Sequence, residues 1–415
     1  MTEKETITYL LGSQMPQYEF TGSEEREEGV VVFKMDRRED APYVCSNCGQ
    51  ASPFAYDTLA TRLVEDMPWG DTRVFLEFAP RRVCCPYCHK TRVEKLQGLS
   101  GMNRQTDRFR LKMARWCEKS PVSQVAEEHG LDYKTVWRAD KEFLERRDAA
   151  SDGPYCEKPG IDEIAIRKGH VYSSLFYDHG RRCVVEMAEG RKREQTEAFF
   201  RRMGPDWCAH VLVVTCDLWK AYKTAVKKFL PNARAITDKF HVFQYAGDAL
   251  DELRRSEYAR QREKTEFDLK KCRFLILKSN ANLDDRGKRR IEQLKEANAN
   301  LYTGYPLKER VFTFYGFESR ADAETYLDEW ASSCVKSNLK PFVALGRRLK
   351  RHRASILAYF DYKISNGFAE GINNMVKVIK RMAFGYRDFA YFRLKVLAAT
   401  GKLAPLPRHI KSDAA

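Results

Sequence analysis

The chain has 415 residues, 43% of them hydrophobic and 12% aromatic, so it can bury more than one core and we expect two to four domains. Its 73 Lys and Arg against 58 Asp and Glu leave a net charge of +15, which favours a polyanion, above all nucleic acid, as partner. A solvated basic surface without a partner is the alternative. No stretch approaches the roughly 18 apolar residues of a membrane span, and the N-terminus lacks a secretory signal, so we expect a cytoplasmic protein without a membrane partner.

Two Cys-x-x-Cys pairs mark the N-terminal region. Twelve cysteines in a cytosolic chain argue against a disulfide framework and for a metal. The pairs are Cys45 with Cys48 and Cys85 with Cys88, and together they supply the four thiolates of a closed, structural Zn²⁺ site. Residues 59–78 between them have alternating apolar residues and a Trp-Gly-Asp turn, which predict a strand hairpin that could bring the two pairs together.

Two neighbours leave the ligand set open. Cys84 and His89 could each replace an adjacent ligand, although the spacing favours Cys85 and Cys88. Ordinary buried or redox-active cysteines remain the alternative to a metal site.

Residues 122–147 have the apolar spacing of a DNA-binding helix-turn-helix, with a turn at Gly130. Asp132 is a candidate N-cap for the second helix, and residues 106–120 predict a preceding helix of the same bundle. A helical hairpin that serves only as a spacer is the alternative. The candidates for contacts in the DNA groove are Tyr133, Lys134, Thr135 and Arg138.

A domain boundary follows in the glycine- and proline-containing stretch 151–160, where the pattern changes from helical to strand-like. We expect three consecutive strands, a helix, a buried strand, a second helix, a short strand and a further helix from near Asp238. Three antiparallel strands followed by parallel strands added through helices is the order of a ribonuclease-H-like fold. The strands are expected at 161–166, 170–178, 182–189, 210–217 and 233–237, and the helices at 193–203 and 219–230.

In this order the acid of the first strand, Asp162, lies beside the acid of the fourth, Asp217. Glu370 stands near the start of a later predicted helix and could reach the pair. Carboxylates that converge from separate elements are what a phosphodiester-cutting site built on two divalent cations requires. Second choices for this site are Asp178, Asp238 and His241.

Three basic residues follow Glu370 on the same predicted helix. Lys377, Lys380 and Arg381 suit phosphate contacts, and a solvated helix face is the alternative.

These motifs together resemble the ISL-three family of bacterial insertion-sequence transposases, which carry a DDE catalytic triad. The resemblance covers nearly the whole chain and implies that Asp162, Asp217 and Glu370 are the triad. It also implies that a helical insertion, from about residue 246 to 365, splits the ribonuclease-H-like core. Local sequence agrees, because 249–277 and 287–301 predict long charged helices. The matching segments are CSNCG, RRVCCPYC, the helix-turn-helix, GIDEIAIRKGHVY, VTCDLWKAY, TDKFHVF and SNGFAEGINNMVKVIKRMAFGYRDF.

The expected fold class is therefore α+β and multidomain, with a zinc-binding module, a helix-turn-helix and a split ribonuclease-H-like α/β core. The expected ranges are 1–98 for the zinc module, 99–150 for the helix-turn-helix, 155–245 for the first part of the core, 246–365 for the insertion and 366–415 for the last part of the core.

The resemblance implies a nucleoid-associated transposase that binds terminal inverted repeats of double-stranded DNA and cleaves and joins strands. We expect Mg²⁺ or Mn²⁺ at the catalytic site, structural Zn²⁺ and a homodimer that holds two transposon ends. Two alternatives are a catalytically inactive DNA-binding regulator derived from a transposase and a structure-specific ribonuclease-H-like nuclease.

Overall fold

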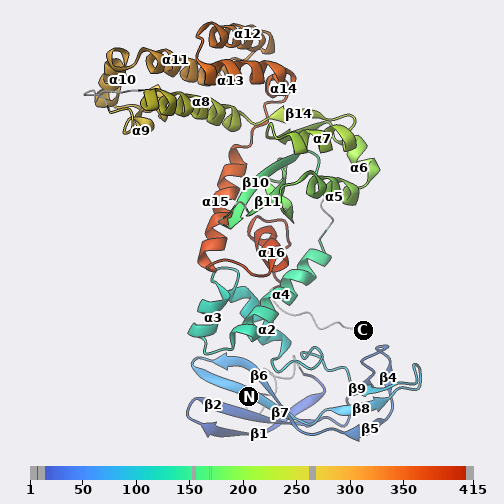
Figure 1. The fold of residues 1–415 in the computed structure, drawn as a ribbon. Coiled ribbons are helices and arrows are strands. Elements are labelled where there is room, and N and C mark those ends of the chain that lie inside the picture. Colours follow the sequence, from blue (N-terminus) through green and yellow to red (C-terminus); the bar gives the residue numbers. More distant parts are fainter. Residues whose placement is uncertain are drawn as a thin grey trace. The chain divides into compact units, whose positions relative to one another are not determined.

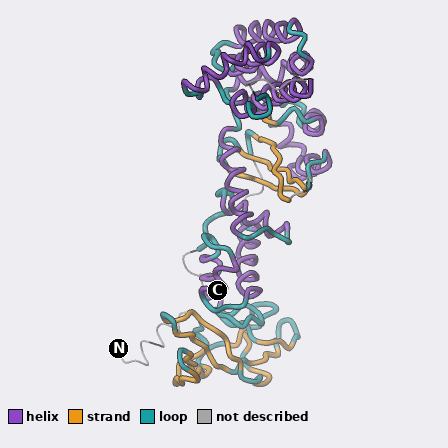
Figure 2. The backbone as a smooth tube through the Cα atoms, turned by 60° about the vertical axis from the view of Figure 1, so that its left-hand side comes forward, coloured by secondary structure: helices purple, strands orange, loops and turns teal. Residues whose placement is uncertain are grey.

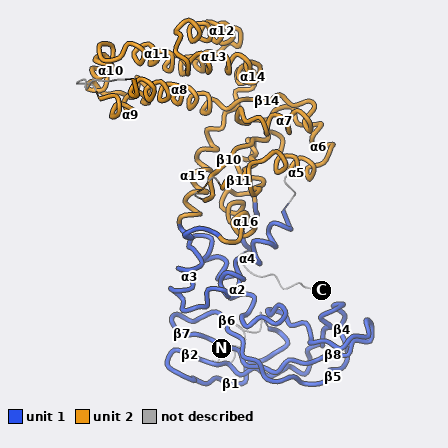
Figure 3. The backbone as a smooth tube through the Cα atoms, in the orientation of Figure 1, with its two compact units in different colours: residues 1–151, 382–386, 403–415 blue, residues 152–381, 387–402 orange. Residues whose placement is uncertain are grey.

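The computed structural model describes residues 7, 15–151, 156–167, 169, 171–260 and 268–407. The chain divides into two compact units (Figure 3). The first unit comprises 1–151, 382–386 and 403–415, and the second comprises 152–381 and 387–402. Among the helices in the described part of the chain, none combines the length and the apolar character needed to cross a membrane.

The first unit begins with small β-sheets, labelled in Figure 1. The largest has the order β1-β2-β7-β6, with β2 and β7 parallel and the other neighbours antiparallel. Two smaller sheets, β3-β4 and β5-β8-β9, carry the cysteine pairs. The strands are β1 Tyr18–Glu27, β2 Val30–Arg37, β3 Tyr43–Val44, β4 Ala51–Ser52, β5 Ala55–Thr58, β6 Arg62–Trp69, β7 Thr72–Phe78, β8 Arg81–Cys84 and β9 Thr91–Val93.

The hairpin predicted between the cysteine pairs is confirmed as β6 and β7. In β7 every second residue, Val74, Leu76 and Phe78, is buried, because side chains alternate between the two faces of a strand. Gly70 takes a φ of 61° at the turn, a conformation that glycine adopts without steric cost.

After the sheets, the described part of the first unit continues with three helices: α2 (Asp107–Trp116), α3 (Val122–Glu128) and α4 (Tyr133–Ala149). Thr106 caps α2 and Asp132 caps α4, each accepting a hydrogen bond from the backbone N–H three residues later. Gly130 turns the chain between α3 and α4 with a φ of 61°. All three predicted helices, the predicted turn and the predicted cap are therefore confirmed.

The second unit contains a five-stranded mixed sheet with the order β12-β11-β10-β13-β14. β10, β11 and β12 form an antiparallel meander, and β13 and β14 add in parallel after helices, as the sequence predicts. Helix α6 was not predicted. The elements are β10 Pro159–Arg167, β11 Val171–Asp178, β12 Cys183–Glu189, α5 Arg193–Met203, α6 Pro205–His210, β13 Val213–Cys216, α7 Lys220–Phe229 and β14 Arg234–Thr237.

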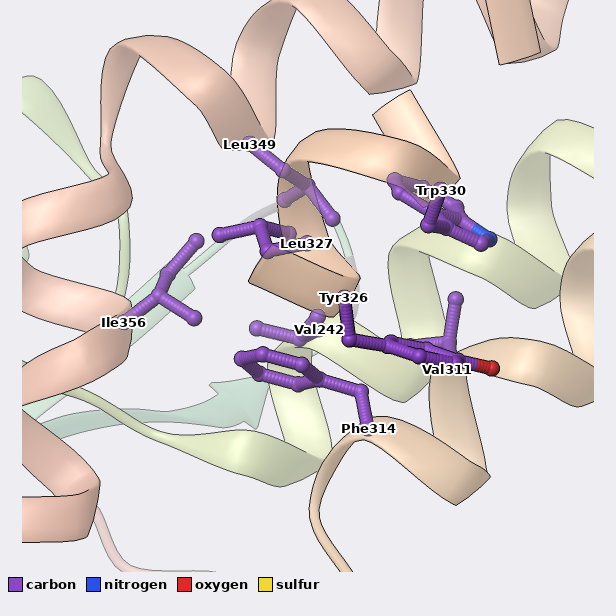
Figure 4. A pocket seen from close by; sticks show the side chains of 8 residues that line it. All are labelled: Val242, Val311, Phe314, Tyr326, Leu327, Trp330, Leu349 and Ile356. Atoms are coloured by element: carbon purple, nitrogen blue, oxygen red, sulfur yellow. The ribbon is translucent and has the colours of Figure 1, made fainter. Parts of the chain in front are cut away.

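Between β14 and α15 the described chain contains helices and loops but no strand, and Figure 2 shows this helical body in purple. Its core joins all its longer helices, and Figure 4 shows Val242 of α8, Phe314 of α11, Trp330 of α12, Leu349 of α13 and Ile356 of α14 around one apolar pocket. The helices are α8 Lys239–Arg260, α9 Arg273–Leu277, the 3₁₀ turn Asn280–Asn282, α10 Asp285–Ala297, α11 Ala299–Phe314, α12 Arg320–Lys336, α13 Lys340–Arg351 and α14 Arg353–Tyr362.

Two helix predictions in this body are wrong in their extent. The helix expected over 249–277 is interrupted at 268–272, where the Asp268 carboxylate accepts the N–H groups of Lys270 and Lys271; residues 261–267 lie outside the described part. The helix expected over 287–301 is two helices, because Asn298 ends α10 and caps α11 by accepting the N–H of Leu301.

The last two helices return to the sheet. α15 spans Gly367–Met382 and lies alongside β10 and β11 in Figure 1. α16 spans Phe389–Ala399 and packs on β12, where Arg393 pairs with the buried carboxylate of Glu186.

Candidate active site and zinc centre

The four predicted cysteine ligands meet at one point. The sulfur atoms of Cys45, Cys48, Cys85 and Cys88 all lie within 4.8 Å of one another, with 3.7 Å between Cys45 and Cys88 and 3.5 Å between Cys48 and Cys85. Four sulfurs at 2.3 Å from a tetrahedral zinc ion would be about 3.8 Å apart. The donor set and its spacing therefore fit Zn²⁺, with no position left open for catalysis.

Each cysteine pair is followed by a backbone turn of the same kind, and this similarity decides between the alternative ligands. Gly49 donates its N–H to Cys45 O and has a φ of 77°, and His89 donates its N–H to Cys85 O with a φ of 54°. His89 therefore takes the turn position that Gly49 takes in the first pair, and Cys84 is the exposed last residue of β8. Neither belongs to the cluster. The backbone N–H of Cys88 lowers the pKa of the Cys85 thiol to about 7, despite partial desolvation.

The candidate DNA-contacting residues lie where the sequence predicts, at the start of α4. Tyr133, Lys134 and Arg138 are exposed, whereas Thr135 is half-buried. The N–H of Thr135 donates to the Asp132 carboxylate, and its hydroxyl lies 3.2 Å from the same oxygen. The buried Val136 and Ala139 turn the opposite side of α4 towards the other helices.

Strand register brings the first two acids side by side. Ile161 of β10 pairs with Cys216 of β13 in parallel, so Asp162 and Asp217 are the next residues on neighbouring strands. Both side chains are mostly shielded, with 13% and 24% of their surface exposed.

Each aspartate is held by hydrogen bonds from a distant helix. Asn373 of α15 donates its amide to Asp162 Oδ2 at 2.9 Å, and Tyr177 of β11 donates its hydroxyl to Asn373 at 2.6 Å. Tyr245 of α8 donates its hydroxyl to Asp217. These bonds fix the carboxylates while leaving other oxygen lone pairs available.

His241, a second choice from the sequence, lies between the two aspartates. Its Nε2 is 3.7 Å from Asp162 Oδ1 and its Nδ1 is 3.9 Å from Asp217 Oδ1. Burial alone would lower the pKa of His241, but its interaction with Asp162 and the charges of Asp217 and Asp238 outweigh burial and raise that pKa to about 9. The carboxylates around His241 therefore favour its protonated form.

Asp178 and Asp238, the other second choices from the sequence, each accept a hydrogen bond from a nearby backbone N–H. Asp178 is buried and accepts the N–H of Gly180 at 2.8 Å in the turn after β11. Asp238 is also buried and accepts the N–H of Phe240 at 3.4 Å at the start of α8, and burial raises its pKa.

Glu370 stands in the first turn of α15, as predicted, and is exposed. Asn366, four residues earlier, accepts the hydroxyl of Thr215 in β13 at 2.8 Å, and Asn373, three residues later, bonds Asp162. Glu370 and Asn373 are three residues apart on α15, so they share the side of the helix from which Asn373 reaches Asp162. Its carboxylate has no hydrogen bond or ion pair with any described residue.

Asp162, Asp217 and Glu370 do not form a compact cluster of ligand atoms in this structure. Of all the described His, Cys, Asp and Glu residues, only the four cysteines form a set of three or more with ligand atoms all within 4.8 Å. The structure thus brings Asp162 and Asp217 together and places Glu370 on the adjoining helix.

The basic residues predicted on α15 follow in its later turns. Lys377 is exposed and Lys380 is half-buried, with its Nζ 3.4 Å from Ala165 O. Arg381 is also exposed. On the same helix Ile372 and Val376 are buried, whereas 41% of Met375 is exposed.

Comparisons with known proteins identify the family of this chain. A family model for the DDE domain, described as "Transposase", matches residues 160–396, and one described as "Helix-turn-helix domain of transposase family ISL3" matches residues 103–144. The chain belongs to the ISL3 transposase family. The sequence-based resemblance to that family is therefore confirmed.

Two relatives of this transposase family extend the match over most of the chain. The transposase for insertion sequence element IS1001 from Bordetella parapertussis is 32% identical over 359 residues, covering 86% of this chain and 88% of that protein. The transposase for insertion sequence element IS1557 from Mycobacterium tuberculosis is 28% identical over 425 aligned residues, covering 94% of each chain.

The sequence did not single out the residues that hold the aspartates in place. Tyr245 lies four residues after His241, and Asn373 lies three residues after Glu370. Helical spacing from the candidate acids and histidine was the available signal. The long-range partner of each residue could not be read from that spacing.

We predict that the metal module depends on its four clustered cysteines and not on Cys84. Cys48→Ser and Cys85→Ser should lose about one bound zinc ion per chain and unfold the module, because a structural zinc site contributes directly to folding. Zinc content by atomic absorption, with proteolysis of residues 15–98, measures both effects. Cys84→Ser is the matched control and should keep its zinc; zinc retained in Cys48→Ser and Cys85→Ser would contradict the assignment.

Proposed function

We propose that this chain binds the ends of an insertion sequence, cuts the DNA there and joins the freed ends to a target, as a DDE transposase. The observation that carries the proposal is the position of Asp162 and Asp217, each directly after the paired residues Ile161 and Cys216 of neighbouring parallel strands, with Glu370 on the helix whose Asn373 contacts Asp162. Relatives named as transposases over most of the chain support it.

We infer that the second unit is a ribonuclease-H-like core split by a helical insertion. The sheet order β12-β11-β10-β13-β14 and the all-helical stretch between β14 and α15 support this reading. The domain ranges 155–245, 246–365 and 366–415 remain our proposal, as do 1–98 and 99–150. One continuous helix, α8, crosses residue 246, so the core and the insertion would share it.

The donor set of the proposed active site fits hard divalent cations. Carboxylate oxygens are the ligands that Mg²⁺ and Mn²⁺ prefer. Asp162 would be shared between two cations, with Asp217 and Glu370 each completing one coordination sphere. When bound, such cations lower the pKa of an attacking water or hydroxyl and stabilise the leaving oxygen.

Neighbouring residues would hold the carboxylates of Asp162 and Asp217 in fixed orientations. Asn373 of α15 donates a hydrogen bond to Asp162, and Tyr245 and the N–H of Leu218 donate to Asp217. Fixed carboxylates lose little freedom when they bind cations, which favours a productive geometry. No side chain needs to form a covalent bond with DNA in this scheme.

The first unit would supply the DNA specificity. We propose that Tyr133, Lys134, Thr135 and Arg138 enter the major groove at a terminal inverted repeat, supported by the zinc module. Lys377, Lys380 and Arg381 would contact phosphates near the active site. Joining requires two transposon ends at once, so we expect a homodimer.

We predict that the proposed triad is essential for chemistry but not for DNA binding. Asp162→Asn and Glu370→Gln should each lower cleavage and joining by roughly a thousandfold, because metal-ion catalysis contributes several kcal/mol of transition-state stabilisation. The assay uses a labelled duplex carrying an end of the element, a target duplex and Mg²⁺.

The control is Glu189→Gln, an exposed acid on β12 that should leave both steps unchanged. Full activity in Asp162→Asn or Glu370→Gln would remove the triad assignment. Cleavage of branched DNA without any end joining would instead favour a structure-specific nuclease.

We also predict that α4 reads the sequence of the element's end. Lys134→Ala and Arg138→Ala should each weaken binding to the end by about 1–3 kcal/mol if they contact bases, and by a smaller, sequence-independent amount if they contact phosphate only. Fluorescence anisotropy with matched and scrambled ends distinguishes the two. Lys119→Ala, an exposed cation outside α4, is the control; unchanged affinity in both α4 variants would argue against this helix as the reader.

A further inference from the structure

An open groove of about 810 Å³ begins next to Asp217 in the second unit. One wall is α7 and the other is the junction between α13 and α14, and Leu218 contributes to the lining. We call it the α7 groove. Five of its eight lining residues are Lys or Arg, and none is Asp or Glu. Pockets for small molecules are lined mainly by apolar side chains, so this lining points to an anionic ligand instead.

The cations of the groove are arranged along one side of α7. Lys220, Lys223 and Lys227 are spaced three and four residues apart, which places them on one helix face. From Lys220 to Lys227 the helix rises about 10 Å, enough to meet more than one phosphate of a DNA strand.

Most of this charge is not neutralised by the protein. Lys220, Lys227 and Arg351 are exposed and form no ion pair within the described part of the chain. Lys228, by contrast, lies 3.4 Å from the Glu197 carboxylate. Unpaired cations that face one groove leave a positive potential that a polyanion can satisfy.

Lys223 is held in place by uncharged partners. Its Nζ lies 3.0 Å from His352 Nδ1 and 3.5 Å from the Ser355 hydroxyl. Burial lowers the pKa of Lys223, and burial together with Lys223, Arg348 and Arg351 lowers the pKa of His352. Of these two shifts, that of His352 in part reflects the positive charges near this wall of the groove, whereas that of Lys223 reflects mainly its burial.

The groove lies next to a residue that contacts a proposed active-site acid. Leu218 lines it, and the N–H of Leu218 donates to the carboxylate of Asp217. A ligand along α7 would therefore end beside an acid proposed to bind catalytic cations.

We propose that the α7 groove binds the phosphate backbone of DNA next to the phosphodiester that is cut or joined. This inference rests on the proposed function, because DNA is the polyanion that the active site would act on. The bound segment is either the flank of the element's own end or the target DNA, which share the same phosphate chemistry.

The test compares two triple variants with equal loss of charge. The groove variant is Lys220→Ala, Lys227→Ala and Arg351→Ala, and the control is Lys288→Ala, Arg289→Ala and Lys336→Ala, exposed cations of α10 and α12 that do not line the groove. Binding of the full chain to a fluorescein-labelled random-sequence duplex is measured across a salt series. The groove variant should bind roughly tenfold more weakly, and its salt slope should fall by up to about 2.7, at roughly 0.9 for each phosphate contact removed.

Two reactions then identify the segment. Loss of end cleavage assigns the groove to the flank of the element's end, whereas intact cleavage with lost joining of precut ends assigns it to target DNA. If the groove variant matches the control in salt slope and in both reactions, the inference is wrong.

Asp162→Asn keeps this test separate from that of the proposed function. If Asp162→Asn is inactive and the groove variant behaves like the control triple variant, only the proposal that the α7 groove binds DNA is refuted. An active Asp162→Asn beside a reduced salt slope would refute the catalytic assignment and leave the DNA-binding groove standing.

Discussion

The parallel pairing of β10 with β13 is the interaction on which the proposed active site depends. Because Ile161 is in register with Cys216, two aspartates 55 positions apart in the chain, Asp162 and Asp217, become neighbours. A shift of one residue would turn one of them to the opposite face of the sheet. The hydrophobic cluster that contains Ile161, Phe176 and Val214 stabilises this register. The positions of the two aspartates therefore depend on the packing of the sheet.

Hydrogen bonds, and not only apolar packing, connect α15 to the same sheet. Asn366 bonds Thr215 of β13, and Asn373 bonds Asp162 of β10, so the helix is fixed on both sides of Glu370. Buried hydrogen bonds of this kind are costly to leave unmade, which makes the position of the helix specific. Glu370 lies between these two contacts, in the first turn of α15, and is exposed.

The sequence predicted those features that depend on local pattern. Cysteine spacing identified the four clustered thiols, and apolar periodicity identified the helices around Gly130 and the strands that carry Asp162 and Asp217. It did not predict β1 and β2, where β1 ends in four consecutive charged residues, or the break at Asn298, where a cap overrides a helical pattern. Nor could it predict the Tyr245 and Asn373 contacts, since these depend on how distant helices pack.

The central claim is that Asp162, Asp217 and Glu370 converge on paired cations when DNA is bound. Its most direct test is a crystal structure of the complete chain with a cleaved element end and Mn²⁺, in which anomalous scattering locates the manganese. The account predicts two manganese ions about 4 Å apart, with Asp162 contacting both and Asp217 and Glu370 contacting one each. Manganese bound elsewhere, or a Glu370 carboxylate that contacts neither ion in that complex, would contradict it.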